Sequence, residues 1–172
     1  VADVLTMQQS LGNLSGKTVT YVGDFNNVAR SLCEASAMLG MHIRLGCPEG
    51  YDAQDNELLG LTELGAASVE QYRDIAIAVT GAHAVHTDTW TSMGQESESA
   101  EREAVFTGFE VTNEIMSLAD SNAIFMHCLP AHRGQEVSPL VIDGPQSKIY
   151  QQAHNRMHAA RGVLAFLMGV QQ

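Results

Sequence analysis

Short apolar runs alternate with longer amphipathic segments along this chain, and glycines punctuate the boundaries. The runs are the kind that a strand buried in a parallel sheet needs. The longer segments place apolar residues three or four positions apart, as at Val28, Leu32, Ala35 and Leu39, which is typical of a helix with one buried face. The alternation predicts an α/β fold, built as a doubly wound parallel sheet flanked by helices.

Each expected element ends near a glycine or a polar turn. We expect strands over residues 17–22, 41–45, 66–69, 83–87 and 123–126, and helices over residues 28–39, 55–64, 72–79, 98–106, 112–118 and 152–168. No linker or low-complexity stretch interrupts them, so the 172 residues are expected to form a single Rossmann-like domain.

Two polar segments follow the last two expected strands. Asp88-Thr-Trp-Thr-Ser-Met-Gly94 follows one, and His127-Cys-Leu-Pro130 follows the other. Residues just past the strand ends of an open α/β sheet line its ligand crevice, so the two segments are expected to meet. One offers a carboxylate and a hydroxyl, and the other an imidazole and a thiol. Such a set suits a small charged substrate with an amine to be activated.

These segments resemble the ornithine carbamoyltransferase family, in its ornithine-binding half. The family's D-x-x-x-S-M-G loop is matched at residues 88–94, and its H-C-L-P loop at residues 127–130. Residues 22–27 are similar to its G-D-x-N-N turn, and Asn155-Arg156 to a pair in its final helix. The aspartate-utilising relatives lack the S-M-G and H-C-L-P pair, so the resemblance points to ornithine.

The resemblance implies transfer of the carbamoyl group of carbamoyl phosphate to the δ-amine of L-ornithine, giving L-citrulline and phosphate. The family's S-T-R-T phosphate loop and its H-P-x-Q segment do not occur in this sequence. Residues 1–172 are therefore expected to be the ornithine-binding domain, without the N-terminal carbamoyl-phosphate-binding domain and inactive alone. The full enzyme is expected to be a cytoplasmic, trimer-based homo-oligomer that needs no cofactor.

By resemblance, four residues bind ornithine. Asn27 and the Met93 backbone N–H would bind its α-carboxylate, and Asp88 and Ser92 its α-amino group. An ammonium needs charge-assisted acceptors and a carboxylate needs donors, so the residue types fit. Without the resemblance, Asp88 is more simply explained as a turn cap and Ser92 as a plain loop residue.

The resemblance also names residues for the reacting groups. The Cys128 thiol would lie beside the δ-amino group, and the Leu129 carbonyl would accept from the carbamoyl nitrogen, which makes Asp88 and Cys128 the candidate catalytic residues. Arg156 would point at carbamoyl phosphate, where a guanidinium stabilises developing negative charge. His127 either contacts substrate or only holds its loop. The alternatives are a small buried hydrophobe for Cys128 and a surface ion pair for Arg156.

The turn after the first expected strand contains one glycine, Gly23, so the dinucleotide-binding pattern G-x-G-x-x-G is absent. This disfavours a nucleotide-binding α/β domain. Asp24 or Asn26 is expected to cap the turn, and Phe25 stands where the family usually has Gly. An amino-acid-binding module without catalytic activity remains the other interpretation of this chain.

Charge and cysteine content exclude further classes. A net charge of −11 argues against nucleic acid, because phosphate contacts need clustered Lys and Arg. No apolar run approaches the length of a membrane span. Cys33, Cys47 and Cys128 are widely spaced and form no C-x-x-C, which favours reduced thiols over a disulfide frame or a zinc site.

Two histidine pairs raise the question of a metal site. His83 and His86 are expected to point to opposite faces of a strand. His154 and His158 lie one helical turn apart, a spacing compatible with metal binding, but no third ligand is apparent in the sequence. The sequence therefore predicts no metal site. His154 also stands where the family usually has an acidic residue, next to Asn155 and Arg156.

Overall fold

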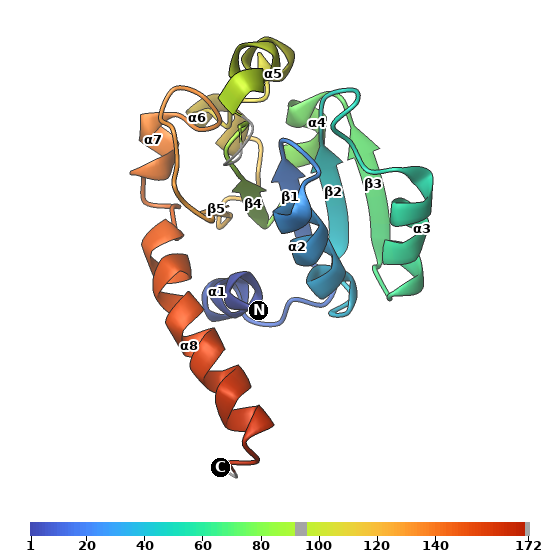
Figure 1. Cartoon of the computed structure of the whole chain (residues 1–172), viewed down its shortest axis with the longest axis vertical. Coiled ribbons are helices and arrows are strands. Elements are labelled where there is room, and N and C mark those ends of the chain that lie inside the picture. The colour runs from blue at the N-terminus through green and yellow to red at the C-terminus, as the bar shows by residue number, and fades with distance from the viewer. Residues whose placement is uncertain (92–95, 171–172) are drawn as a thin grey trace.

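The computed structural model describes residues 1–91 and 96–170 and contains a five-stranded parallel sheet flanked by helices (Figure 1). The strands are β1 Thr18–Val22, β2 His42–Gly46, β3 Ser68–Tyr72, β4 Ala84–Thr87 and β5 Ile124–His127. The helices are α1 Ala2–Leu11, α2 Asn27–Ala37, α3 Asp55–Glu63, α4 Ile75–Val79, the 3₁₀ turn η1 Glu96–Glu98, α5 Ser99–Phe106, α6 Asn113–Met116, α7 Pro139–Ile142 and α8 Ile149–Leu167. The expected α/β fold is confirmed.

Both faces of the sheet are buried, because successive residues of a strand point to opposite sides. Ile124 and Met126 of β5 pack in one apolar cluster with residues of α1, α2 and α3. Phe125, between them, packs in a second cluster with residues of α4, α6 and α7. This double burial explains why the strands appear in the sequence as continuous apolar runs.

The strand order β3-β2-β1-β4-β5 places the site. The chain builds the sheet outward from β1 to β3, then returns to add β4 on the other side of β1. Ligands of open α/β sheets bind where the order reverses in this way, outside the carboxyl ends of the strands. The register pairs Val22 with Thr87 and Thr87 with His127, so the three following segments leave the sheet side by side.

Helix α1 is an element that the sequence pattern did not predict, and it packs against α8 (Figure 1). The side-chain amide of Asn155 donates to Thr6 Oγ1 and to Gln9 Oε1, each at 2.8 Å. Gln152 donates to Asp3 Oδ1 at 2.7 Å. These buried amides fix the first half of α8 to the domain. Short α7 was not predicted either.

The second half of α8 extends beyond the body of the domain, as Figure 1 shows. Six apolar residues at this end are exposed: Val163, Leu164, Phe166, Leu167, Met168 and Val170. A contiguous exposed apolar surface usually marks an interaction site. Within the described residues, no helix is long and apolar enough to cross a membrane.

The prediction that a helix begins at Tyr72 is wrong. Tyr72 instead ends β3, where it pairs with Gly46, and α4 begins only at Ile75. The Asp74 side chain accepts from the backbone N–H of Ala76 at 2.8 Å, which provides the N-cap at that point. The other expected elements exist, with ends shifted by a few residues.

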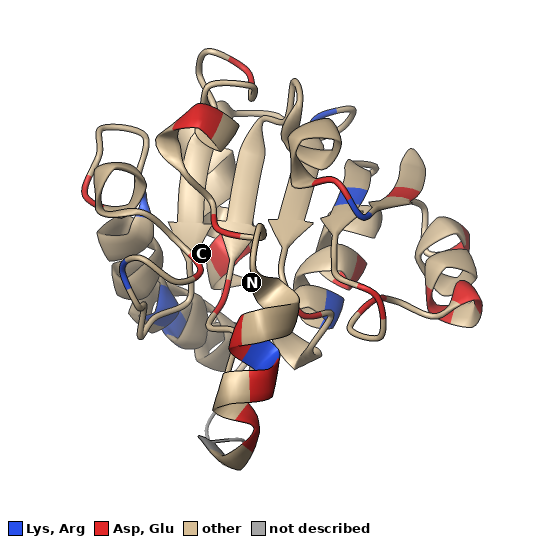
Figure 2. Ribbon diagram, turned by 90° about the horizontal axis from the view of Figure 1, so that it is seen from above, with Lys and Arg blue, Asp and Glu red and all other residues tan. Residues whose placement is uncertain are grey.

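Acidic residues outnumber basic ones and are spread over helices and loops around the sheet (Figure 2). A surface of this sign repels anions at long range. An anionic ligand would therefore depend on donors placed at its own binding site.

Candidate functional site

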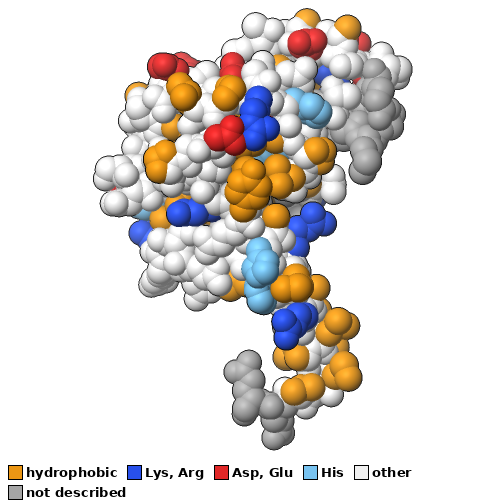
Figure 3. Space-filling model, turned by 90° about the vertical axis from the view of Figure 1, so that its left-hand side faces the viewer, with side chains coloured by type: hydrophobic (Ala, Val, Ile, Leu, Met, Phe, Trp, Pro, Cys, Tyr) orange, Lys and Arg blue, Asp and Glu red, His pale blue; other side chains and the backbone are white. Residues whose placement is uncertain are grey.

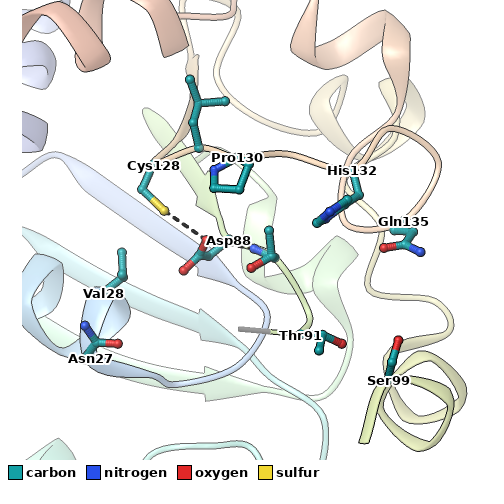
Figure 4. Close-up of a pocket in the computed structure, with 11 residues that line it drawn as sticks. Asn27, Val28, Asp88, Thr91, Ser99, Cys128, Pro130, His132 and Gln135 are labelled. Carbon is teal, nitrogen blue, oxygen red and sulfur yellow. Dashed lines mark hydrogen bonds between the residues drawn. The ribbon is translucent and has the colours of Figure 1, made fainter. Parts of the chain in front are cut away.

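A pocket of about 680 Å³ lies at the point where the strand order reverses. Its described lining comes from the segments after β1, β4 and β5 and from the start of α5: Asn27, Val28, Asp88, Thr89, Thr91, Ser99, Cys128, Leu129, Pro130, His132 and Gln135. Figure 4 shows Asp88 and Cys128 facing each other near its centre. None of these lining residues is Lys or Arg, so the carboxylate makes this part of the pocket better suited to an ammonium than to a phosphate.

The Asp88 carboxylate accepts hydrogen bonds from three directions. Oδ1 accepts from the Thr89 backbone N–H at 2.8 Å and from the Cys128 thiol at 2.9 Å. Oδ2 accepts from the Asn26 side-chain amide at 3.1 Å. Asp88 therefore does stabilise its own turn, as the simpler explanation required. It also lines the pocket, which a turn cap alone would not need.

The Cys128 thiol is partly exposed in the pocket, whereas Cys33 and Cys47 are buried. This answers the alternative that Cys128 is a small buried hydrophobe. Burial raises the pKa of Cys128 well above its usual range, and the hydrogen bond to the Asp88 carboxylate raises it further. The sulfur is therefore a neutral donor at rest. A thiolate nucleophile would need the opposite surroundings.

The turn after β1 divides its polar residues between structure and pocket. Asn26 caps α2, since its Oδ1 accepts from the backbone N–H groups of Val28 and Ala29. The neighbouring Asn27 is exposed and lines the pocket, as predicted for a ligand-binding residue. Asp24 does not serve as the cap; its carboxylate pairs with Arg102 of α5.

Arg102 and Trp90 hold the segment after β4 against the domain. The buried Arg102 guanidinium also donates to the Trp90 carbonyl, and its carbon lies 4.7 Å from the centre of the Tyr51 ring. The Trp90 ring stacks on Phe106 with 5.8 Å between ring centroids. Trp90 therefore supports this segment by packing.

The His127 side chain is fully buried beneath the pocket and does not line it. Its Nδ1 accepts from the Leu129 backbone N–H at 2.9 Å, so Nε2 carries the proton and faces Glu136 Oε1 at 3.2 Å. Glu136 is buried as well and also accepts from the His132 backbone N–H. Of the two roles considered, this geometry favours the one in which His127 holds the loop.

The loop it holds is strained. Leu129 lines the pocket with φ at 60°, a left-handed conformation that is rare for a residue with a branched side chain. Such backbone persists only where the surroundings fix it, and it is common at ligand sites. The His127 bond to the Leu129 N–H is one contact that fixes it here.

The structure does not bring Arg156 to the pocket. It is exposed on α8 and is not among the lining residues. Within the described residues it forms no ion pair, so the alternative of an ordinary surface ion pair has no support either. Burial and the Asp88 and Asp3 carboxylates raise the pKa of Cys128, and Arg156 is not among the groups that shift it. Ser92 and Met93 lie outside the described residues.

His132 and Gln135 line the pocket but were not singled out from the sequence. They belong to the loop between β5 and α7, so their closeness to Pro130 along the chain was the available signal. Ser99 and Thr91 were missed as well. Thr91 occupies an unspecified position of the D-x-x-x-S-M-G loop, and Ser99 is an ordinary hydroxyl residue with no motif around it.

Asp88, His127 and Cys128 offer ligand atoms within 4.8 Å of one another, a separation that a metal ion could bridge. Each of these side chains already faces a protein group: the Cys128 thiol donates to Asp88, and His127 Nε2 lies 3.2 Å from Glu136 Oε1. These contacts account for the arrangement, and it gives no separate reason to assign a metal.

Residues 15–167 match the family model described as "Aspartate/ornithine carbamoyltransferase, Asp/Orn binding domain". The chain belongs to this family. The match includes the segments that build the pocket, from the turn after β1 to the loop after β5.

Individual relatives agree with this assignment. The chain is 49% identical over 171 residues to an ornithine carbamoyltransferase of Parasynechococcus marenigrum and 48% identical over 172 residues to one of Symbiobacterium thermophilum. Each alignment covers 98% of this chain but 54% and 55% of the relative, so the chain spans about half their length.

Solved structures show the same relationship. The ornithine carbamoyltransferase from Pyrococcus furiosus superposes with a TM-score of 0.89 and 42% identity, over 99% of this chain and 56% of that one. The enzyme from Gloeobacter violaceus superposes with a TM-score of 0.88 and 38% identity, over 97% and 56%. The resemblance drawn from the two polar loops is thus confirmed at the level of family.

Proposed function

We propose that this chain is the ornithine-binding half of an ornithine carbamoyltransferase, which produces L-citrulline and phosphate for arginine and citrulline metabolism. The observation that carries the proposal is the contact between Asp88 and Cys128 inside the pocket. It joins an acceptor for an ammonium to a neutral thiol, in a family whose curated relatives are named for ornithine.

In the proposed complex, Asp88 and Ser92 bind the α-amino group of ornithine, and Asn27 and the Met93 N–H bind its α-carboxylate. Asn27 and Asp88 support this because they line one pocket. Asp88 carries the one carboxylate among the described lining side chains, and it attracts the ammonium by charge-assisted hydrogen bonding. The Asn27 amide offers two N–H donors to the carboxylate end.

The δ-amine, after losing a proton, attacks the carbamoyl carbon, the bond from that carbon to the phosphate oxygen breaks, and phosphate leaves with the electron pair. The nitrogen then loses a second proton to give the neutral ureido group of citrulline. Cys128 acts as a hydrogen-bonding partner of the amine, since its raised pKa makes it a poor nucleophile. The Leu129 carbonyl accepts from the carbamoyl nitrogen. Holding the two substrates together contributes much of the rate.

Carbamoyl phosphate needs cationic donors, and the described lining of this pocket has none. We assign those donors to a second, N-terminal domain and to Arg156, with His127 supporting the loop from below. The exposed apolar end of α8 is the surface we assign to contact with that domain. The complete enzyme is proposed to be cytoplasmic and a homo-oligomer built on trimers.

The test is complementation. The part of the Parasynechococcus marenigrum relative that this chain does not match is produced separately and mixed or joined with this chain, here called the joined enzyme. We expect citrulline from the joined enzyme and none from either half alone. Ornithine binding by this chain without citrulline from the joined enzyme would favour the alternative, an amino-acid-binding module without catalysis. The absence of both ornithine binding by this chain and citrulline formation by the joined enzyme would refute the proposal.

A further inference from the structure

Two histidine side chains lie next to each other on α8, away from the pocket. The ring centroids of His154 and His158 are 4.7 Å apart. Both residues are exposed, and Figure 3 shows histidine side chains together on this helix where it leaves the body of the domain. Neither lines the pocket.

The spacing preorganises the two rings. Residues four positions apart on a helix project from the same face, so the backbone already holds both imidazoles close together. A metal–nitrogen distance of about 2.1 Å places two neighbouring ligand nitrogens roughly 3 Å apart, which rings at this separation reach by side-chain rotation. Within the described part of the chain, no hydrogen bond or ion pair occupies either ring.

The ligand type selects the ion. Imidazole suits divalent copper, nickel and zinc, whereas magnesium and calcium prefer oxygen ligands. Copper, nickel and zinc ions fill their remaining coordination positions with water when the protein supplies fewer than four ligands. The sequence offers no third protein ligand, but an exposed site does not require one.

We propose that His154 and His158 form a two-imidazole site for a divalent transition-metal ion, with water completing its coordination. Among these ions Cu²⁺ binds most tightly, as the Irving–Williams order dictates. The ion would join the two ends of the helical turn that contains Arg156, and so stabilise α8 just before its exposed apolar end. This inference does not depend on the proposed function.

The test is a titration of the 172-residue chain with Cu²⁺, followed by calorimetry and by electron paramagnetic resonance. A Cys128→Ser background removes the pocket thiol as a competing ligand and reductant. We expect one tight site per chain with two nitrogen ligands. His154→Ala or His158→Ala alone should weaken binding at least about tenfold, because the second ligand then no longer binds intramolecularly.

A matched control keeps the number of histidines and breaks their spacing. The double variant His158→Ala with Ala160→His puts the rings six positions apart, on different faces of the helix. It should bind as weakly as the single variants while circular dichroism shows unchanged helix content. Equal affinity of this control and the parent chain, or a spectrum with one nitrogen ligand in the parent, would overturn the proposal.

Thermal unfolding gives a second readout. An ion that binds the folded helix raises the melting temperature of the parent chain. The control variant should show a smaller rise at the same Cu²⁺ concentration. An equal rise in both would show that the stabilising ion sits elsewhere, and would also count against the site.

Discussion

The Cys128 thiol donates a hydrogen bond to the Asp88 carboxylate, with 2.9 Å between Sγ and Oδ1, although the residues are 40 positions apart. The strand register creates this contact, because Thr87 and His127 are paired and each is followed by one of the two residues. The bond joins the two loops that carry the family motifs. Together with burial, it raises the pKa of the thiol.

Replacing Asp88 with Asn removes the negative charge and keeps the size of the side chain. We expect ornithine affinity of the joined enzyme to fall by about 1–3 kcal/mol, the scale of a charge-assisted hydrogen bond. Calorimetric titration with ornithine measures it. Asp55→Asn, on the exposed start of α3, is the matched control and should bind normally. Unchanged affinity in Asp88→Asn would reduce Asp88 to a turn residue.

Alkylation should distinguish the three cysteines. Cys128 should label first because it is partly exposed, whereas Cys33 is buried and its pKa is raised to about 12. Labelling of Cys128 should still be slow at pH 7, since its own pKa is raised and only the thiolate reacts. Its rate should increase roughly tenfold per pH unit through pH 8 to 10, in proportion to the thiolate fraction.

The same experiment tests the hydrogen bond. Asp88→Asn removes the carboxylate that raises the Cys128 pKa, so Cys128 should label faster at a given pH. Mass spectrometry after timed labelling identifies the site. Faster labelling at Cys33 or Cys47 than at Cys128 in the unaltered chain would contradict the placement of the His127–Pro130 loop in the pocket.

Glu136 should contribute strongly to stability. Glu136→Leu leaves the His132 N–H without its buried acceptor and removes the carboxylate that lies 3.2 Å from the buried His127 Nε2. Unsatisfied buried groups cost about 1–3 kcal/mol each, so the free energy of unfolding should fall by about 2–4 kcal/mol. Urea denaturation measures it. Glu136→Gln keeps an oxygen acceptor, so its free energy of unfolding should fall by less. Equal falls in the two variants would show that the shape of the side chain, and not its hydrogen bonding, stabilises this position.

Arg102 should be needed for folding of the segment after β4. Arg102→Met removes the buried partner of Asp24 and the donor to the Trp90 carbonyl. Breaking a buried ion pair from one side costs about 3–5 kcal/mol, and the partial exposure of Asp24 places the expected loss near the lower figure. Arg30→Met breaks an exposed pair with Glu57 and should change stability by less than about 1 kcal/mol. A similar loss in both variants would contradict the difference in burial.

Local sequence pattern was enough to predict the sheet, most of its helices and the two loops that meet at the pocket. Apolar runs buried on both faces and glycines at element ends are visible without a structure, because they follow from strand and helix periodicity. The cap at Asn26, one of two candidates in its turn, was also accessible in this way. The role of Asn27 and Cys128 as pocket residues came from motif resemblance, and the structure agrees with their placement.

Tertiary structure decided what depends on contacts between distant residues. Helix α1 forms part of the fold through its packing on α8, and no periodic pattern in the sequence indicates a contact between residues 149 positions apart. The burial of His127 against Glu136, the exposure of Arg156 and the protonated state of Cys128 depend on which groups the strand register brings together. Sequence determines these features only through the assembled fold, since hydrogen bonding and desolvation act over a few ångströms in space regardless of separation along the chain.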